Sequence, residues 1–85
     1  MNLETLVKKY IISTEKVLEE IQRTSNKVTI TEPKIDEILG YVSSYLKDAK
    51  YYKDKKKFET SLTSIAYCEG LLDALRLLGV VEFEW

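Results

Sequence analysis

The sequence of 85 residues predicts an all-α fold, an antiparallel up-down-up three-helix bundle followed by a short extended C-terminal tail. Three observations lead to this prediction. Apolar residues recur at three- and four-residue steps in three long stretches, which is the pattern of amphipathic helices. No strand pattern interrupts those stretches, and a short turn joins the last two, so these should run antiparallel. A chain of this length forms one domain, here residues 1–85.

The first helix is predicted over residues 2–24, with Asn2 as its N-cap. One face carries the positions that we expect in the core: Leu3, Leu6, Val7, Tyr10, Thr14, Val17, Leu18 and Ile21. The helical period breaks over residues 25–33. We expect this connector to cross one end of the bundle with Val28 and Ile30 tucked in, because these two residues alternate with polar ones.

The second helix is predicted over residues 33–54. Pro33, with Thr31 or Glu32 before it, is a helix-start signal, since proline suits the first turn of a helix. The expected core positions of this helix are Ile35, Ile38, Leu39, Val42, Leu46 and Ala49.

The third helix is predicted over residues 57–79 and ends at Gly79, a candidate for the left-handed C-terminal cap position. Residues 80–85 alternate, with Val81, Phe83 and Trp85 on one side, as in a short extended segment. We expect this tail to fold back and close the open end of the bundle. Alternatively, it pairs with the sheet edge of another protein or swaps into a neighbouring copy.

The composition argues against catalysis. The chain has no histidine and one cysteine, so it offers no histidine general base, no multi-cysteine metal site and no Cys-His pair, and it has no glycine-rich phosphate loop. Cys68 falls on the apolar side of the third helix and is expected in the core. We therefore expect a protein that is not an enzyme and uses no cofactor. The sequence shows neither a signal peptide nor a transmembrane span, which predicts a cytoplasmic protein without a membrane partner.

The net charge of −1 conceals a basic segment. Residues 47–57 contain six lysines and two aspartates, a local charge of +4, and the lysines are Lys47, Lys50, Lys53, Lys55, Lys56 and Lys57. Together with Tyr51 they suggest contact with a nucleic-acid backbone. The alternative is a solvated turn whose lysines complement the dipole of the second helix.

A row of side chains on the second helix, Tyr41, Tyr45, Asp48 and Tyr52, lies beside its aliphatic stripe. Tyrosines combine an apolar body with a hydrogen-bonding tip, so such a row is found in protein interfaces and also where a core meets water. Both interpretations remain open from the sequence.

On the third helix, Glu69, Asp73 and Arg76 continue the strip that begins with apolar residues. They form either a small polar site that binds a cation or a basic partner, or an Asp73–Arg76 pair with Glu69 at the rim. Gly70 lies inside the same helix, where glycine is unfavourable, so we expect close packing of another backbone or a tyrosine against it, or a ligand over the exposed backbone.

The stretch from Asp48 to Gly79 contains a D-A-x-Y-Y opening, a short basic turn before an aromatic residue, and a Y-x-x-G-x-L-D-A-x-x-x-L-G close. With these motifs it resembles the archaeal family known as domain of unknown function 357. The resemblance implies a small three-helix bundle and assigns no activity. If the family motif marks a site, the positions that carry over are Asp48, Tyr52, Tyr67, Gly70 and Asp73.

The sequence therefore predicts a helical module that binds another protein or itself, through the tyrosine row, Phe83 and Trp85 of the tail, or both. The competing prediction is an accessory module that binds nucleic acid or nucleotides through the basic segment at residues 47–57. A small-ligand or metal site around Glu69, Asp73 and Arg76 is a third possibility.

Overall fold

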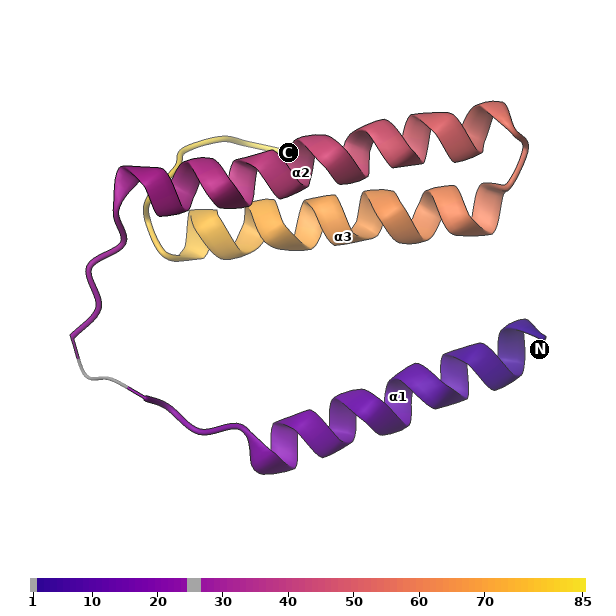
Figure 1. Ribbon diagram of the computed structural model, residues 1–85, viewed down its shortest axis with the longest axis horizontal. Coiled ribbons are helices and arrows are strands. Elements are labelled where there is room, and N and C mark those ends of the chain that lie inside the picture. The colour runs from indigo at the N-terminus through magenta and orange to yellow at the C-terminus, as the bar shows by residue number, and fades with distance from the viewer. Residues whose placement is uncertain (1, 25–26) are drawn as a thin grey trace.

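The chain forms three α-helices, as predicted. The computed structural model describes residues 2–24 and 27–85, and its helices are α1 (Leu3–Glu20), α2 (Glu32–Asp54) and α3 (Phe58–Leu77). They run up, down and up, with α2 and α3 side by side as an antiparallel hairpin and α1 on one side of it (Figure 1). The prediction of an all-α, three-helix architecture is confirmed. None of the described helices is long and apolar enough to cross a membrane.

The core lies between α2 and α3. Ile35 and Ala49 of α2 are buried against Cys68 and Leu75 of α3, and Leu75 is the most deeply buried large side chain of the described residues. Side-chain donors on α3 also bond to carbonyl groups of α2. The Ser61 hydroxyl donates to the Ala49 carbonyl oxygen at 2.7 Å, and the Cys68 thiol donates to that of Val42 at 3.3 Å. Apolar burial and these two bonds together fix how the helices of the hairpin face each other.

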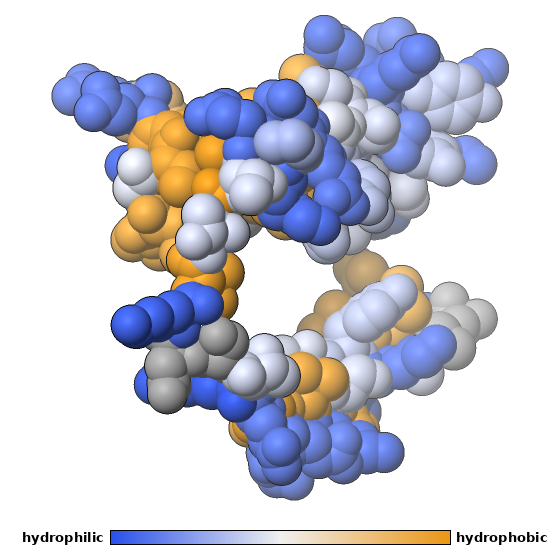
Figure 2. Space-filling model, turned by 60° about the vertical axis from the view of Figure 1, so that its left-hand side comes forward, coloured by the Kyte–Doolittle hydropathy of each residue, from blue (hydrophilic) through white to orange (hydrophobic). Residues whose placement is uncertain are grey.

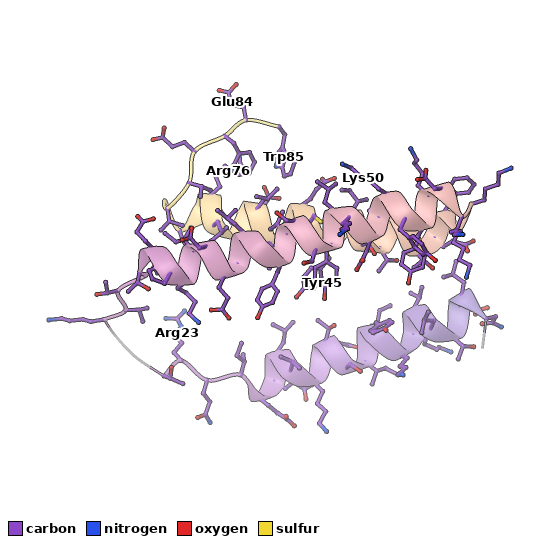
Figure 3. The ribbon with its side chains drawn as sticks, turned by 45° about the horizontal axis from the view of Figure 1, so that its top comes forward. Arg23, Tyr45, Lys50, Arg76, Glu84 and Trp85 are labelled. Carbon is purple, nitrogen blue, oxygen red and sulfur yellow. The ribbon has the colours of Figure 1, made fainter. Side chains whose placement is uncertain are left out.

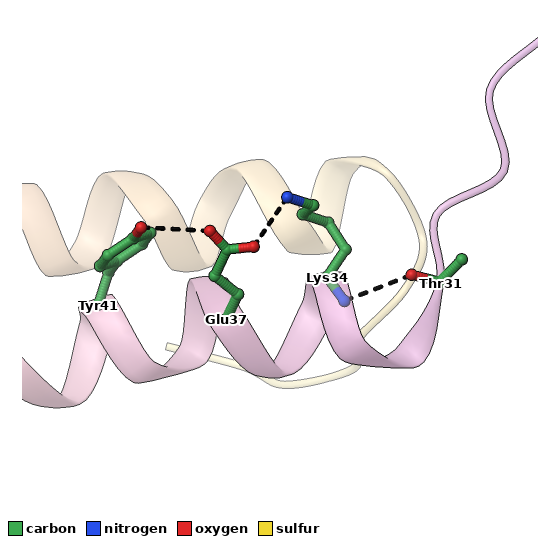
Figure 4. Close-up of polar contacts among 4 residues, drawn as sticks. All are labelled: Thr31, Lys34, Glu37 and Tyr41. Carbon is green, nitrogen blue, oxygen red and sulfur yellow. Dashed lines mark hydrogen bonds and ion pairs between the residues drawn. The ribbon is translucent and has the colours of Figure 1, made fainter.

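The start of α2 follows the predicted signal. The Thr31 side chain accepts a hydrogen bond from the Lys34 backbone N–H at 3.4 Å, and Pro33 lies in the first turn. A chain of polar contacts continues along the surface, with Lys34 bound to Glu37 at 2.8 Å and the Tyr41 hydroxyl donating to Glu37 at 3.2 Å (Figure 4). The hydrogen bond between Lys34 and Glu37 is the main reason why the pKa of Lys34 is raised and that of Glu37 lowered.

Both helices of the hairpin end in a Schellman motif, which satisfies carbonyl groups of the last turn. At the end of α3, Gly79 adopts a φ of 79°, and its N–H donates to the Arg76 carbonyl oxygen while that of Val80 donates to Leu75. The prediction of a left-handed cap at Gly79 is confirmed. At the end of α2 the corresponding left-handed residue is Lys56, with a φ of 61°.

The first helix is shorter than predicted. It ends at Glu20, and Ile21 is already extended, so the prediction of helix over residues 2–24 is wrong for the last four positions. The last turn contains Glu19 and Glu20 and no basic residue, which is unfavourable at the negative end of a helix dipole. The predicted N-cap is confirmed, since the Asn2 side chain accepts a hydrogen bond from the Thr5 N–H at 2.8 Å.

The connector between α1 and α2 differs from the prediction. Val28 is 74% exposed and only Ile30 is partly buried, so the expectation that both are tucked in is wrong for Val28. The reason is that α1 does not lie against the hairpin here, and the connector has no closed bundle end to cover. Of the predicted connector, residues 25–26 lie outside the described part of the chain.

The first helix stands apart from the hairpin. Among the described residues, only α2 and α3 form a packed pair of helices, and α1 buries none of its side chains. Its N-terminal end lies nearer to the hairpin than its C-terminal end (Figure 1), and apolar surface borders the open space between the two parts (Figure 2). The stripe that we predicted as part of the core is therefore exposed.

Candidate interaction surfaces

The hairpin has two different sides. One side, which we call the tyrosine side, carries Tyr41, Tyr45 and Tyr52, which share one face of α2 by their spacing, and Tyr67 of α3, whose ring packs against that of Tyr45. Figure 3 shows Tyr45 on the side of the hairpin that faces α1, whereas Lys50, Arg76 and Trp85 lie on the opposite side, which we call the tail side. The tail runs across the hairpin on that opposite side (Figure 1).

The tyrosine side joins aromatic residues of both helices of the hairpin. The rings of Tyr45 and Tyr67 lie with their centroids 4.4 Å apart and their planes tilted by 37°. Tyr41 and Tyr67 keep 52% and 53% of their surface exposed, while Tyr45 and Tyr52 are partly buried. Asp48, the acidic member of the predicted row, is exposed. The row is thus half core rim and half accessible surface, and the partner of Tyr45 on α3 could not be identified from the spacing within α2.

The tail side contains two of the three predicted polar residues in direct contact. Asp73 accepts hydrogen bonds from the Arg76 guanidinium at 3.2 Å and from the Trp85 indole N–H at 2.8 Å. The Arg76 guanidinium also lies 5.1 Å from the centroid of the Phe83 ring, which meets the Trp85 ring edge to face. The tail folds back, as predicted, but it does not close the open end of the bundle. It lies along the hairpin and binds to the polar cluster on α3, which the sequence treated as a separate feature.

This arrangement favours the structural interpretation of the polar cluster. Asp73 and Arg76 pair as expected at this spacing, and Glu69 is exposed. In the described part of the chain, no group of three histidine, cysteine, aspartate or glutamate side chains is placed to hold a metal ion. The carboxylate and the guanidinium both take their partners from the same polypeptide, with Trp85 and Phe83 supplying the additional contacts.

The expectation of close packing at Gly70 is wrong. A β-carbon added there meets no heavy atom within 4 Å, and the residue is exposed. Gly70 lies on the face of α3 that points away from α2, because the buried Cys68 and Leu75 define the opposite face. No tyrosine of the described chain approaches it.

The basic segment covers the C-terminal part of α2 and the turn at the tip of the hairpin. All six of its lysines are exposed, and the acidic neighbour Asp54 lies 3.9 Å from Lys53. Tyr51 is 56% exposed, and its ring centroid lies 5.6 Å from the Lys55 ammonium and 5.2 Å from the centroid of the Tyr52 ring. The predicted basic patch is therefore a real concentration of positive charge on the surface.

Cys68 is a core residue, as predicted. It is 2% exposed, and burial raises the pKa of its thiol by disfavouring the thiolate. Its burial and its hydrogen bond to the Val42 carbonyl oxygen indicate a structural role for Cys68.

An extended accessible apolar surface lies along α1, and the sequence did not identify it as a site. Large apolar side chains along α1 and at its C-terminal end retain 49–68% of their surface: Leu3, Val7, Tyr10, Ile11, Ile12, Val17, Leu18 and Ile21. We call this surface, without Ile12, the α1 stripe. Ile12 lies on the polar face of the helix. In the sequence, the apolar sector of the first helix is wide because Ile11 extends it, and this width could have indicated an interaction surface.

Comparison with known proteins supports a family but no activity. No curated protein and no solved structure matches the chain significantly. A family model described as a protein of unknown function (DUF357) matches residues 9–81, which span most of α1 and all of the hairpin. The likeness therefore extends well beyond the motifs of residues 48–79. The chain belongs to the DUF357 family of proteins of unknown function.

Proposed function

We propose that this protein is a non-catalytic interaction module of the cytoplasm, which binds another protein or a second copy of itself. The observation that carries the proposal is the exposure of the α1 stripe along the whole helix, with no side chain of α1 buried. Contiguous exposed apolar surface of this extent, bordered by charged residues, is typical of protein-binding sites. An isolated helix of 18 residues is also only marginally stable in water, so α1 gains stability from a partner.

The tyrosine side supports the same proposal. Tyr41 and Tyr67 present accessible rings, and Tyr45, which packs against Tyr67, lies on the side of the hairpin that faces α1 (Figure 3). Tyrosine is enriched in protein interfaces. The tail contributes less, because Trp85 and Phe83 are bound to Asp73 and Arg76 of the same chain. We therefore assign recognition to α1 and the tyrosine side, and a structural role to the tail.

The proposal is tested by light scattering after size-exclusion chromatography and by affinity capture from the native lysate. Leu18→Glu introduces a charge into the α1 stripe, and Ile12→Glu introduces the same charge on the polar face of the same helix. We expect self-association or partner capture by the wild type and by Ile12→Glu, and loss of it in Leu18→Glu. A form that lacks residues 80–85 should behave as the wild type does. The proposal is contradicted if the wild type is strictly monomeric and captures no protein that Leu18→Glu fails to capture.

A second candidate function is binding to nucleic acid at the hairpin tip. The specific observation is the exposure of all six lysines of residues 47–57, close to an exposed tyrosine. Such a site makes contacts with phosphates that weaken steeply as salt rises. Absence of arginine in this segment reduces the scope for bidentate phosphate contacts.

The nucleic-acid candidate is tested by titrating labelled single-stranded and duplex DNA, RNA and nucleotides at about 50 mM salt, followed by a salt series. Replacing Lys53, Lys55 and Lys57 with glutamate should abolish binding. Replacing Lys8, Lys9 and Lys16 of α1 with glutamate changes the net charge equally and serves as the control. Equal losses in the two triple variants would indicate nonspecific attraction, and no binding by the wild type would remove this candidate.

A further inference from the structure

We propose that the partner of the α1 stripe is the α1 helix of a second copy of this chain, lying antiparallel to it in a twofold-symmetric dimer. This inference rests on the proposed interaction function and identifies the molecule that the α1 stripe binds. It is argued from the spacing of the stripe, from the match between its two ends, and from the polar residues that α3 places beside the N-terminal half of α1.

The spacing of the stripe is that of a helix-pairing seam. Five of its residues, together with Thr14, follow one another at intervals of four, three, four, three and four positions: Leu3, Val7, Tyr10, Thr14, Val17 and Ile21. Apolar residues that repeat every 3.5 residues on average form a narrow line suited to one facing helix. The line extends over the whole length of α1 and one residue beyond it.

The two ends of this line match when one copy is reversed. In an antiparallel pair centred on Ile12, Leu3 lies opposite Ile21, Val7 opposite Val17, and Tyr10 opposite Thr14 of the second copy. Each large aliphatic residue meets one of similar size, and the bulky tyrosine meets the small threonine. Alternation of large and small side chains across facing positions allows close packing without voids.

The positions beside the line also suit this pairing. Ile11 and Leu18 flank it on one edge and Leu6 on the other, so apolar side chains widen the contact. The lysines of α1 and two of its acidic residues lie farther from the line, towards the solvent: Lys8, Lys9, Glu15, Lys16 and Glu19. An antiparallel pair therefore buries aliphatic surface without enclosing a set of like charges.

The hairpin of the same chain is a poor match for the N-terminal half of the stripe. There a cavity of about 300 Å³ is lined by Leu3, Leu6, Val7 and Tyr10 from α1 and by Glu59, Thr60 and Thr63 from α3. The Thr63 hydroxyl already donates to the Glu59 carbonyl oxygen at 2.9 Å, but closing this space within one chain would place aliphatic side chains against the Glu59 carboxylate and the Thr60 hydroxyl. Removing such groups from water without new hydrogen bonds is unfavourable.

The charge of α1 does not favour a lipid surface as the partner. The helix has three lysines and four glutamates, so its polar face is slightly acidic. Helices that lie on anionic membranes usually have basic polar faces. A second copy of the chain fits both the apolar line and this mixed polar face.

The contact is small, and this sets the expected affinity. A stable interface takes about 800 Å² from each partner, usually from 20–30 residues. The stripe of an 18-residue helix supplies less than that. We expect a dissociation constant of about 1–100 μM, so that dimer formation depends visibly on protein concentration.

The first experiment is sedimentation velocity on the full-length protein from about 1 μM to about 500 μM. Val7→Glu places a charge within the line, and Ile12→Glu places the same charge on the polar face. We expect the wild type and Ile12→Glu to dimerise as concentration rises, and Val7→Glu to dimerise at least about tenfold more weakly, because its carboxylate loses water in the pair. Both positions are exposed in the single chain, so circular dichroism should show an intact hairpin in each variant.

The second experiment determines the orientation. In a Cys68→Ala background, Val7→Cys and Val17→Cys are prepared as two separate variants, mixed in equal amounts and oxidised. An antiparallel pair gives mainly the mixed disulfide between the two variants, because positions 7 and 17 face each other. A parallel pair gives mainly disulfides between identical variants and overturns the proposed arrangement.

The outcomes separate this inference from the function on which it rests. A dimer that Val7→Glu does not weaken overturns the pairing through α1 but leaves self-association in place. A wild type that stays monomeric over the whole concentration range also overturns the pairing. In that case the proposed interaction function stands only if the wild type captures a different protein from the lysate and Leu18→Glu does not.

Discussion

At the residue scale, Lys56 is the unusual feature of the turn between α2 and α3. It occupies the position after the helix that glycine usually fills, with a φ of 61°. A left-handed backbone destabilises a residue with a side chain by about 1–2 kcal/mol. We expect Lys56→Gly to stabilise the protein by about 1 kcal/mol, after allowing for the greater freedom of glycine in the unfolded chain.

Urea denaturation measures this change. Lys55→Gly is the matched control, since it removes the same charge at a residue whose φ of −85° carries no such strain. The control should be neutral or less stable than the wild type. If both variants change stability equally, the effect comes from charge and the left-handed strain at Lys56 is not the cause.

Gly70 and Gly79 make a second pair of opposite predictions. A β-carbon at Gly70 meets nothing within 4 Å, so Gly70→Ala should stabilise α3 by about 0.5–1 kcal/mol through helix propensity. Gly79 has a φ of 79°, and Gly79→Ala should destabilise by about 1 kcal/mol. Thermal unfolding at a fixed protein concentration compares the two. A loss of stability in Gly70→Ala would show that another molecule packs against this face in solution.

At the element scale, the contact between the tail and α3 is a single connected group. Asp73 binds both Arg76 and Trp85, so Asp73→Ala should free the indole, whose residue is 64% exposed, from the hydrogen bond that holds it on α3. Trp85 is the one tryptophan of the chain, and its fluorescence therefore reports on the tail alone. We expect lower fluorescence anisotropy and stronger quenching by iodide in Asp73→Ala, and no change in Glu69→Ala. Unchanged anisotropy and quenching in Asp73→Ala would contradict the docking of the tail.

The contrast between α1 and the hairpin leads to a prediction for hydrogen exchange. Amides of α2 and α3 next to Ile35, Ala49, Cys68 and Leu75 are shielded by the core, whereas α1 buries no side chain. At low micromolar protein concentration, α1 amides should exchange orders of magnitude faster than those core amides. If α1 is as well protected as the hairpin under dilute conditions, it packs against its own chain.

Local signals predicted the elements well, and the reasons are visible in single residues. Asn2, Pro33 and Gly79 act within a few residues of their own positions, so the sequence places these boundaries accurately. The apolar spacing likewise identified Ile35, Ala49 and Cys68 as core, whereas Leu46, which was also expected there, is 39% exposed. The end of α1 was less predictable, because the acidic turn at Glu19 and Glu20 weakens a helix that no packing supports.

At the scale of the whole molecule, the sequence could not decide which apolar surfaces meet. The projection of α1 shows a stripe but does not say whether the hairpin or another molecule covers it. The contacts of Tyr45 with Tyr67 and of Trp85 with Asp73 join positions 22 and 12 residues apart, and they depend on how whole elements are placed. For the same reason Gly70 was misjudged, since its surroundings depend on what lies beside α3.

The short turn of residues 55–57 has a consequence for how the protein is made. The hairpin closes through contacts between neighbouring helices, as in the bonds from Ser61 to Ala49 and from Cys68 to Val42, and such local topologies fold within microseconds to milliseconds. A ribosome adds only about 5–20 residues each second, and α1 leaves it before the hairpin. The α1 stripe therefore spends seconds in the cell without a folded surface of its own chain beside it. If α1 pairs with a second copy as proposed, nascent chains on the same messenger RNA offer it the nearest matching helices during that interval, and assembly would begin while translation is still under way.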